Sequence, residues 1–439
     1  FRHPGRAIGL GFASAIASGT LLLSLPVARS EGSRAPLLDA VFTATSAVCV
    51  TGLIVVDTET YWSDVGQVVI LILIQLGGLG LMTVATLLAI LFARRLGLQA
   101  RLLAQAETKA VTAADLRRVV RNIVLFTLVT EAIAATVLAA RFMITYGESP
   151  AHALWSGVFH AVSAFNNAGF SLYADSLMRY VTDPWVNAVV ASTVIIGGLG
   201  FPVIFELARS WRRPRAWSVV TRITVIVSVS LLVLGTLVIL AVESGNEATL
   251  GALDGADQLQ GALFASTVAR TAGFNTIDVA ALTPESLFAM DVLMFIGGGS
   301  AGTAGGIKVT TFGLLAFVLW SEIRGEPDVV VGRRRVPAST QRQAVTVALL
   351  GVGLVVSTSF VLQALTPYPF DLVLFETISA FATVGLSTGI TDDLPDAGQV
   401  ILVILMFVGR LGPLTLASAL AMRDRHRPYR LPEERIIVG

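Results

Sequence analysis

Long runs of apolar residues alternate with short polar stretches along the whole chain. The first run, Ala7 to Ala28, holds 22 residues without a charge, enough to cross a bilayer at about 1.5 Å per residue. Comparable runs predict further crossings over residues 65–93, 122–146, 184–207, 223–242, 286–322, 344–365 and 400–422. The hydrophobic content of 54% and charged content of 14% exclude an ordinary soluble domain. We therefore predict an all-α polytopic membrane protein with eight transmembrane helices.

A short motif ending in glycine lies between the two crossings of each successive pair. Its four copies read FTATSAVCVTGL, FHAVSAFNNAGF, FASTVARTAGF and FETISAFATVGL, and their glycines are Gly52, Gly169, Gly273 and Gly385. A hydroxylated residue stands six positions before each glycine: Ser46, Ser163, Thr267 and Ser379. A second glycine motif follows each copy, beginning at Gly77, Gly197, Gly297 and Gly409. Two linked motifs that recur four times indicate an internal repeat.

The repeat divides the chain into four modules, each with a crossing, a short segment and a second crossing. We place the first module at residues 1–95, the second with a preceding basic loop at 96–212, the third at 213–323, the fourth with its basic loop at 324–422, and a tail at 423–439. Each short segment is too short to cross the bilayer twice, so it should enter and leave on one side as a re-entrant half-helix. Four half-helices can surround a pseudo-fourfold central pore.

The charges sort by side of the membrane. Of the 31 Lys and Arg residues, 24 fall in the N-terminal stretch, the three loops between modules and the C-terminal tail. The positive-inside rule makes these segments, and both termini, cytoplasmic. Acidic residues collect on the opposite side, where they should concentrate cations: Asp57, Glu59, Asp64, Asp175, Asp183, Asp392, Asp393 and Asp396.

The residue types argue against an enzyme active site and against a metal site. A single cysteine, Cys49, excludes an intrachain disulfide and a cysteine metal cluster, and the four scattered histidines argue against a transition-metal site. The chain has no Ser/His/Asp, HExxH or paired-carboxylate constellation. We therefore predict that it is not an enzyme.

The residues that lead up to each motif glycine are the candidate ion ligands. Their side chains are mostly small or apolar, so the ligands on offer are backbone carbonyls, rings of which replace the hydration shell of a monovalent cation. Glycine suits such a ring because it adopts positive φ angles that a Cβ opposes. Alternatively, the glycines only allow close helix packing; four copies, each after a possible half-helix, favour the pore. The candidate selectivity filter is Val50, Thr51, Gly52, Asn167, Ala168, Gly169, Thr271, Ala272, Gly273, Thr383, Val384 and Gly385.

These motifs resemble the Trk/Ktr/HKT superfamily of potassium transporters over nearly the whole chain. FHAVSAFNNAGF and GGGSAGTAGGIK match that family's motifs almost residue for residue, and the final PEERIIVG is similar to the ends of Ktr chains of the KtrB type. We expect no extra helix pair before the first crossing. The resemblance implies K⁺ uptake across the bacterial cytoplasmic membrane, promoted by Na⁺, by a homodimer with one pore per subunit. It further implies gating by a cytoplasmic RCK-type ring, a KtrA-like regulator that binds ATP or ADP. It implies no covalent cofactor and no nucleic-acid partner.

The resemblance also assigns a gate below the filter. The stretch from Gly297 to Lys308 holds six glycines, which disfavour a helix, and in the family this stretch is a loop that obstructs the pore. Arg410 interrupts an uncharged crossing, where it must face a cavity or a partner; the resemblance places it near the gate, and a structural ion pair is the alternative. The gate residues are Gly297, Gly298, Gly299, Ser300, Gly302, Gly305, Gly306, Lys308 and Arg410. A regulator that grips residues 324–342, through Arg333, Arg334 and Arg335, could pull on this loop. Alternatively, the excess of basic residues is only the topological signal and attracts anionic lipid, which needs no protein partner.

Four further polar residues lie in apolar surroundings. We interpret Arg270 and Glu376 as a buried pair behind the filter, and His160, at the position that corresponds to Glu376, as a further support. Glu131, an isolated intramembrane carboxylate, could instead couple K⁺ symport to Na⁺ or H⁺, although a hydrogen bond to a neighbouring helix is the commoner role for such a residue.

Overall fold

The chain folds almost entirely into α-helices. The computed structural model describes residues 4–101, 113–332 and 334–422, and these contain fifteen α-helices. The tail and Arg333 lie outside the described residues. The first predicted module holds α1 (Pro4–Leu23), α2 (Leu37–Cys49), α3 (Thr58–Tyr61) and α4 (Asp64–Arg101), and the second holds α5 (Ala113–Tyr146), α6 (Pro150–Asn166), α7 (Pro184–Leu199) and α8 (Phe201–Ser210).

The second half of the chain repeats this order with one insertion. The third predicted module holds α9 (Val219–Glu243), α10 (Gly255–Val268), α11 (Pro284–Phe295) and α12 (Val309–Arg324). A hairpin of β1 (Val330–Val331) and β2 (Arg334–Arg335), paired antiparallel, follows α12. The fourth holds α13 (Ala338–Leu365), α14 (Phe370–Ala382) and α15 (Asp396–Met422).

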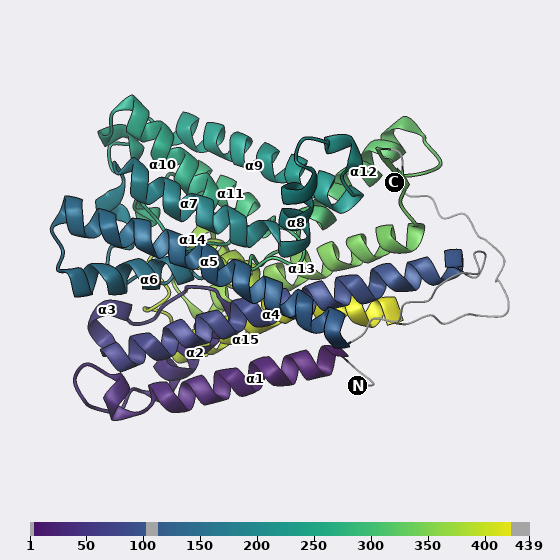
Figure 1. Ribbon diagram of the computed structural model, residues 1–439. Coiled ribbons are helices and arrows are strands. Elements are labelled where there is room, and N and C mark those ends of the chain that lie inside the picture. Colours follow the sequence, from purple (N-terminus) through teal and green to yellow (C-terminus); the bar gives the residue numbers. More distant parts are fainter. Residues whose placement is uncertain (1–3, 102–112, 333, 423–439) are drawn as a thin grey trace.

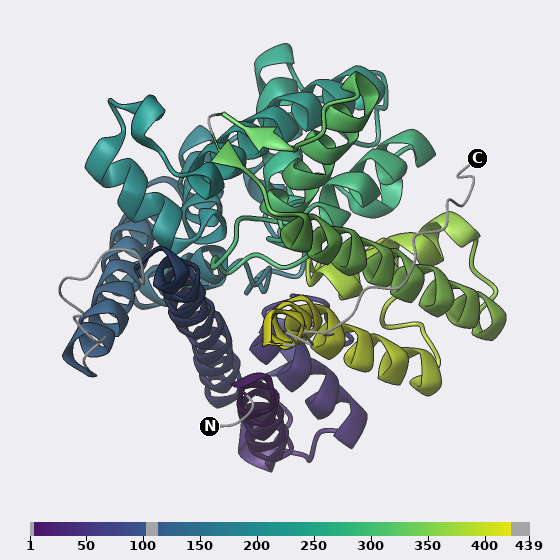
Figure 2. The same ribbon diagram turned by 90° about the vertical axis from the view of Figure 1, so that its right-hand side faces the viewer.

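The long helices lie roughly side by side along one direction (Figure 1), and the shorter α2, α6, α10 and α14 lie in the left half of that view. Viewed along the long helices, the chain passes once around a centre in sequence order, from purple through teal and green to yellow (Figure 2). Helix contacts close this circuit: α6 contacts α4, α10 contacts α7, α14 contacts α11, and α2 contacts α15. Each short helix therefore packs against the return helix of the preceding module.

The hydrophobic core surrounds the short helices. Phe42, Phe159 and Phe375, each ten positions before its motif glycine, are fully buried, as is Phe264 in the third copy. By contrast, α9 exposes Ile226, Val229, Val233 and Leu237 at helical spacing, as expected of a face that meets lipid. The motif phenylalanines therefore anchor the short helices in the centre of the bundle.

Several helices have the length and apolarity to cross a bilayer. Within the described residues these are Asp64–Thr86, Arg117–Tyr146, Val219–Glu243 and Ala338–Leu365, with a fifth if α7 and α8 count as one span. The predicted interruption of the run 286–322 is confirmed, because α11 ends at Phe295 and α12 begins at Val309. The full set of eight crossings stays a prediction.

One predicted helix is broken. The sequence predicted a continuous crossing over residues 184–207, but α7 and α8 meet at an angle of 102°. Gly200 joins them with a φ of 92°, and Pro202 lacks the N–H group that would continue the helix. A Cβ on Gly200 would collide with the carbonyl oxygen of Ser300, so the third module occupies the bend.

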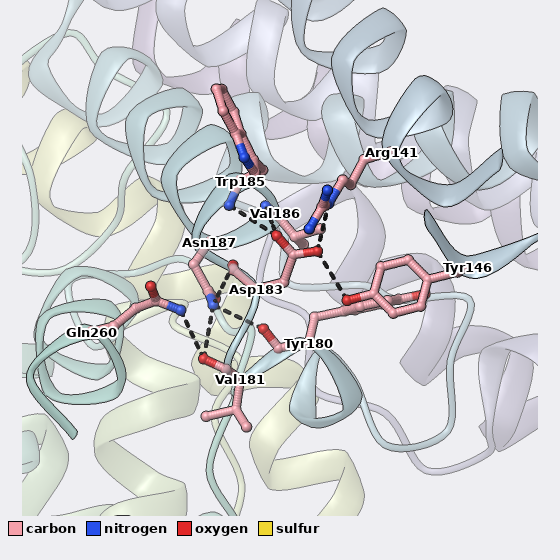
Figure 3. Close-up of polar contacts among 9 residues, drawn as sticks. All are labelled: Arg141, Tyr146, Tyr180, Val181, Asp183, Trp185, Val186, Asn187 and Gln260. Atoms are coloured by element: carbon pink, nitrogen blue, oxygen red, sulfur yellow. Dashed lines mark hydrogen bonds and ion pairs between the residues drawn. The ribbon is translucent and has the colours of Figure 1, made fainter. Parts of the chain in front are cut away.

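A polar cluster fixes the end of the bundle opposite the basic loops. Figure 3 shows Asp183 at its centre: its carboxylate accepts hydrogen bonds from Arg141 Nε at 2.8 Å and from the Tyr146 hydroxyl at 2.9 Å, and it caps α7. Gln260 on α10 donates to the carbonyl of Val181 at 2.8 Å and so ties the second module to the third. Asp183 is therefore a structural residue and adds little free negative charge to the predicted outer face.

We predict that Asp183→Ala lowers the stability of the folded protein by about 2 kcal/mol, because it leaves the Arg141 guanidinium unpaired and uncaps α7. The Asp183 side chain is 2% exposed and that of Arg141 is 31% exposed, which moderates the cost. Thermal unfolding in detergent measures the change. The control is Asp175→Ala, whose pair with Arg179 lies at the surface and should contribute less than about 1 kcal/mol. Equal midpoints for the two variants would show that the cluster is dispensable.

Candidate functional site

The short helices end in a repeated backbone conformation. Two residues before each motif glycine, a residue other than glycine adopts a positive φ: 55° at Val50, 59° at Asn167, 76° at Thr271 and 50° at Thr383. The glycines follow with φ of 93°, 73°, 74° and 95°. Residues with a Cβ rarely adopt this conformation, and it persists only where surrounding contacts enforce it. The four copies therefore share a strained geometry as well as a sequence.

The four glycines meet one another. An ideal Cβ built on Gly52 would lie 3.1 Å from the Cα of Gly169, and one on Gly169 would lie 2.7 Å from the Cα of Gly273. A Cβ on Gly273 would lie 3.2 Å from the Cα of Gly385, and one on Gly385 would lie 3.0 Å from that of Gly52. The contacts close a ring through all four modules in chain order.

Backbone carbonyl oxygens fill the space that side chains would need in this ring. A Cβ on Gly169 would lie 2.9 Å from the carbonyl oxygen of Ala272, and one on Gly273 would lie 2.6 Å from that of Val384. A Cβ on Gly52 or Gly385 would collide with the carbonyl oxygens of Ala168 and Thr51, respectively. The side chains of these four carbonyl-bearing residues are buried. The ring therefore offers main-chain oxygens rather than side-chain groups.

The hydroxylated residues six positions before each glycine hold the chain near the ring. The hydroxyl oxygens of Ser46 and Ser379 accept hydrogen bonds from the N–H groups of Gly52 and Gly385, at 3.0 and 3.2 Å. Ser163 instead donates to the carbonyl of Phe170 at 2.8 Å. Thr267 donates back into its own helix, to Leu263. Three of the four hydroxyls therefore bind the motif's own backbone.

The second glycine motif has a packing role. A Cβ on Gly77, Gly197 or Gly409 would collide with a carbonyl oxygen near the end of the short helix in the same module, at Val48, Phe165 and Phe381, respectively. Close helix packing, the alternative considered for the first motif, therefore describes the second. In the third module, a Cβ on Gly297 would instead meet the carbonyl of Gly305.

The glycine-rich stretch from Gly297 to Lys308 contacts three of the four candidate filter segments. The Thr303 hydroxyl donates to the side-chain oxygen of Asn167 at 2.9 Å, and the Gly305 N–H donates to the Thr271 hydroxyl at 3.2 Å. A Cβ on Gly305 would also collide with the hydroxyl oxygen of Thr383. No motif in the sequence pointed to Thr303, which only the fold brings beside the second module.

Backbone hydrogen bonds fasten the same stretch to the second module. The N–H of Gly299 donates to the carbonyl of Gly198 at 2.8 Å, and that of Thr303 donates to Gly197 at 3.1 Å. Further along, Gly306 turns with a φ of 64° and Val309 N–H returns to the carbonyl of Gly298 at 3.0 Å. The stretch is non-helical, as predicted, and it is hydrogen-bonded to its neighbours.

A cavity of about 190 Å³ separates this stretch from α4 and α15. Its walls include Leu81 and Ala85 of α4, Ser300 and Lys308 of the glycine-rich stretch, and Arg410 of α15. The Lys308 ammonium donates to the carbonyl of Ala304. The fold therefore brings the two basic residues predicted for the gate to one cavity.

Arg410 is buried, with 4% of its surface exposed, and its Nη1 lies 3.4 Å from the Thr383 hydroxyl. Its Nε and Nη2 have no hydrogen-bond partner among the described residues, and no ion pair to Arg410 is formed within them. The alternative of a structural ion pair therefore finds no partner in the described chain. A buried guanidinium with free donors beside a cavity is suited to act on whatever enters that cavity.

The predicted pair of Arg270 with Glu376 is wrong. Arg270 donates to the carbonyl and hydroxyl oxygens of Ser228 on α9, at 3.1 and 3.0 Å. Glu376 accepts from the Ser387 hydroxyl at 2.6 Å and from the Thr388 N–H at 2.8 Å. Each charged group instead has neutral hydrogen-bonding partners within its own module. The spacing of residues along the sequence could not reveal these partners.

Glu376 and His160 occupy matching positions and make matching contacts. His160 Nε2 lies 3.0 Å from the hydroxyl oxygen of Ser171, and Glu376 lies 2.6 Å from that of Ser387. Each serine stands two residues after a motif glycine. Both side chains therefore join a short helix to the segment that leaves the ring.

Glu131 belongs to a three-helix polar network. Its carboxylate accepts from Gln75 Nε2 of α4 and from Asn166 Nδ2 of α6, each at 3.1 Å, and Asn166 also donates to Gln75 Oε1 at 2.9 Å. Asn166 directly precedes candidate filter residue Asn167. The hydrogen bonds to neighbouring helices agree with the commoner role that the sequence allowed for Glu131.

Comparison with known proteins gives matches along almost the full chain. The TrkH family, described as a cation transport protein, matches residues 12–426. The chain is 40% identical to the Ktr system potassium uptake protein B of Vibrio alginolyticus over 435 residues, which are 99% of this chain and 94% of the relative. It is 32% identical to the potassium/sodium uptake protein NtpJ of Enterococcus hirae over 442 residues, 99% and 97% of the two chains. The crystal structure of the potassium transporter TrkH from Vibrio parahaemolyticus has the same fold, with a TM-score of 0.70, 20% identity, and coverage of 93% of this chain and 84% of that one.

Proposed function

Because the chain belongs to the TrkH family of cation transport proteins, a family of transporters rather than enzymes, we propose that it takes up potassium through the ring of four glycines. The closed ring of glycines supports this proposal. In it, the carbonyl oxygens of Thr51, Ala168, Ala272 and Val384 each face the glycine of a neighbouring module. Carbonyl rings replace the hydration shell of K⁺. Na⁺ acts as a stimulating ion rather than as the main cargo.

The surrounding architecture supports this function. In this proposal each of the four predicted modules contributes two crossings and one re-entrant half-helix, and the pore follows the axis around which the chain is arranged in Figure 2. The C-terminal ends of α2, α6, α10 and α14 lead directly into the ring, so their partial negative charges favour a cation there. The basic loops lie on the cytoplasmic side of a bacterial membrane.

The gate is the glycine-rich stretch together with Arg410. It lies beside the filter segments that Thr303 and Gly305 contact, and the cavity of about 190 Å³ carries both Arg410 and Lys308. The Arg410 guanidinium in this cavity opposes the entry of K⁺. Movement of this stretch away from Asn167 and Thr271 opens the path.

Regulation comes from a second protein. A cytoplasmic ring of RCK-type nucleotide-binding subunits, which responds to ATP or ADP, docks on the basic loops of a homodimer of this chain. Residues 325–337 join α12, which follows the gating stretch, to α13. A regulator bound there can transmit force to the gate through α12.

The first prediction tests the filter. Gly52→Ser should lower the K⁺ over Na⁺ permeability ratio by about tenfold, equivalent to about 1.4 kcal/mol, because a Cβ at a φ of 93° collides with the carbonyl oxygen of Ala168. Ion flux into proteoliposomes measures the ratio. The control is Gly353→Ser, a helical position where a Cβ meets no atom within 4 Å. An unchanged ratio in a folded Gly52→Ser protein would remove the filter assignment.

The second prediction tests the gate. Arg410→Gln should raise K⁺ flux by roughly tenfold, since it removes a positive charge from the proposed path. Arg342→Gln, an exposed residue at the start of α13, is the matched loss of charge and should leave flux unchanged. Deleting Ser300–Gly305 would also remove the hydrogen bonds to Asn167 and Thr271, so it confounds the gate with the filter. If Arg410→Gln folds and conducts no better than the parent, the arginine does not gate.

The third prediction tests the regulator. Reversing Arg333, Arg334 and Arg335 to Glu should weaken co-purification with a nucleotide-binding ring and should uncouple flux from nucleotide, while the K⁺ over Na⁺ ratio stays the same. Arg34→Glu, an exposed arginine before α2, is the control at the opposite end of the bundle. Full nucleotide control in the triple variant would exclude this loop as the docking site.

A further inference from the structure

An arginine-lined pocket of about 420 Å³ lies apart from the ring and from the gate. The loop between α8 and α9 forms one wall, with Arg215, Trp217 and Arg222, and the β1–β2 hairpin forms the other, with Val331 and Arg334. Figure 2 shows the hairpin as green arrows at the end of the bundle that faces the viewer. Gly332 at the turn lies so close to the Arg222 guanidinium that a Cβ there would collide with it.

The three guanidinium groups have no carboxylate partner in the described parts of the chain. Among the described residues, Arg222 Nη2 donates only to the backbone carbonyls of Pro214 and Arg215, at 3.4 and 3.5 Å. By contrast, the neighbouring Arg335 pairs with Asp328 at 2.8 Å. Three positive charges that line one pocket and form no ion pair within the described residues make a site for an anion.

The carboxylate that interacts with Arg334 already accepts hydrogen bonds from other groups. Glu206 of α8 interacts electrostatically with Arg334, but its oxygens accept hydrogen bonds from the Ser218 N–H at 2.6 Å, the Ser218 hydroxyl at 2.7 Å and the Thr221 hydroxyl at 2.6 Å. One carboxylate offsets at most one of the three arginines. A net positive charge therefore remains on the pocket.

The pocket stands at the boundary of the apolar region. Val219 of its lining begins α9, and the uncharged run of that helix starts at Ile223, directly after Arg222. Trp217 fixes its indole by donating from Nε1 to the carbonyl of Ser210 at 3.0 Å. Tryptophan and arginine are typical of the level of the lipid headgroups. An anion at this depth is most readily supplied by the membrane itself.

We propose that this pocket binds the phosphate of an anionic phospholipid headgroup. Arg215, Arg222 and Arg334 supply forked N–H donors that suit phosphate oxygens, while Trp217 and Val219, which are partly exposed, contact the glycerol and upper acyl region. A bound lipid links the α8–α9 loop to the hairpin that follows α12. The site is separate from the ion path. Arg334 also belongs to the loop proposed to dock the regulator, so Arg215 and Arg222, which lie outside that loop, are the first residues to test.

The experiment is native mass spectrometry of the purified transporter in neutral detergent, titrated with phosphatidylglycerol or, in parallel, phosphatidylcholine. The double variant Arg215→Gln with Arg222→Gln should lose roughly tenfold or more in apparent affinity for phosphatidylglycerol. The control, Arg212→Gln with Arg213→Gln, removes the same charge from exposed residues of the same loop that do not line the pocket. It should retain the affinity of the parent. Equal loss in both double variants, or in neither, overturns the site.

A substitute variant and a second ligand complete the experiment. If the double variant does not elute as a folded protein, the affinity of Arg334→Gln for phosphatidylglycerol is measured instead. Arg334 is exposed and forms no ion pair within the described chain, so its substitution should not disturb the fold. Titration with inorganic phosphate alone distinguishes the source of the anion. Arginine-dependent binding of phosphatidylglycerol that inorganic phosphate does not displace supports the lipid. Arginine-dependent binding of inorganic phosphate without binding of phosphatidylglycerol overturns it.

Discussion

The fold depends on the close approach of four backbone segments at one point. Each motif glycine gives the space of its missing Cβ to a neighbouring segment, and the residue two positions earlier is held at a positive φ although it has a Cβ. Such a conformation is costly at each copy and needs enforcement by its surroundings. Much of the chain outside the ring can be understood as the structure that enforces it.

Several sets of contacts hold the ring segments in this conformation. The hydroxyls of Ser46 and Ser379 bind the N–H groups of two ring glycines, while His160 and Glu376 hold the segments that leave the ring. Behind them, glycines of the return helices let those helices lie against the ends of the short helices. These contacts act within each module, whereas the four ring glycines meet across modules, so a change in one module reaches the others through the ring. Residues that never meet an ion are therefore expected to influence ion preference.

Sequence reasoning recovered the helices and the repeated motifs because both depend on local pattern. The apolar runs gave the long helices, and the fourfold recurrence singled out Gly52 and its counterparts. It failed where the outcome depended on tertiary neighbours: the bend at Gly200 accommodates Ser300 of another module, and Arg270 found Ser228 rather than Glu376. The contact of Thr303 with Asn167 joins residues 136 positions apart, and no single-sequence signal reports such a distance.

The central claim is that main-chain oxygens of the four-glycine ring bind K⁺, and locating bound cations tests it most directly. Crystals of the purified protein grown in K⁺ and exchanged into Rb⁺ would place the ion by its anomalous scattering. We expect Rb⁺ on the axis of the ring, in contact with the carbonyl oxygens of Thr51, Ala168, Ala272 and Val384. Rb⁺ bound at a side-chain carboxylate such as Glu131, with the ring empty, would contradict it.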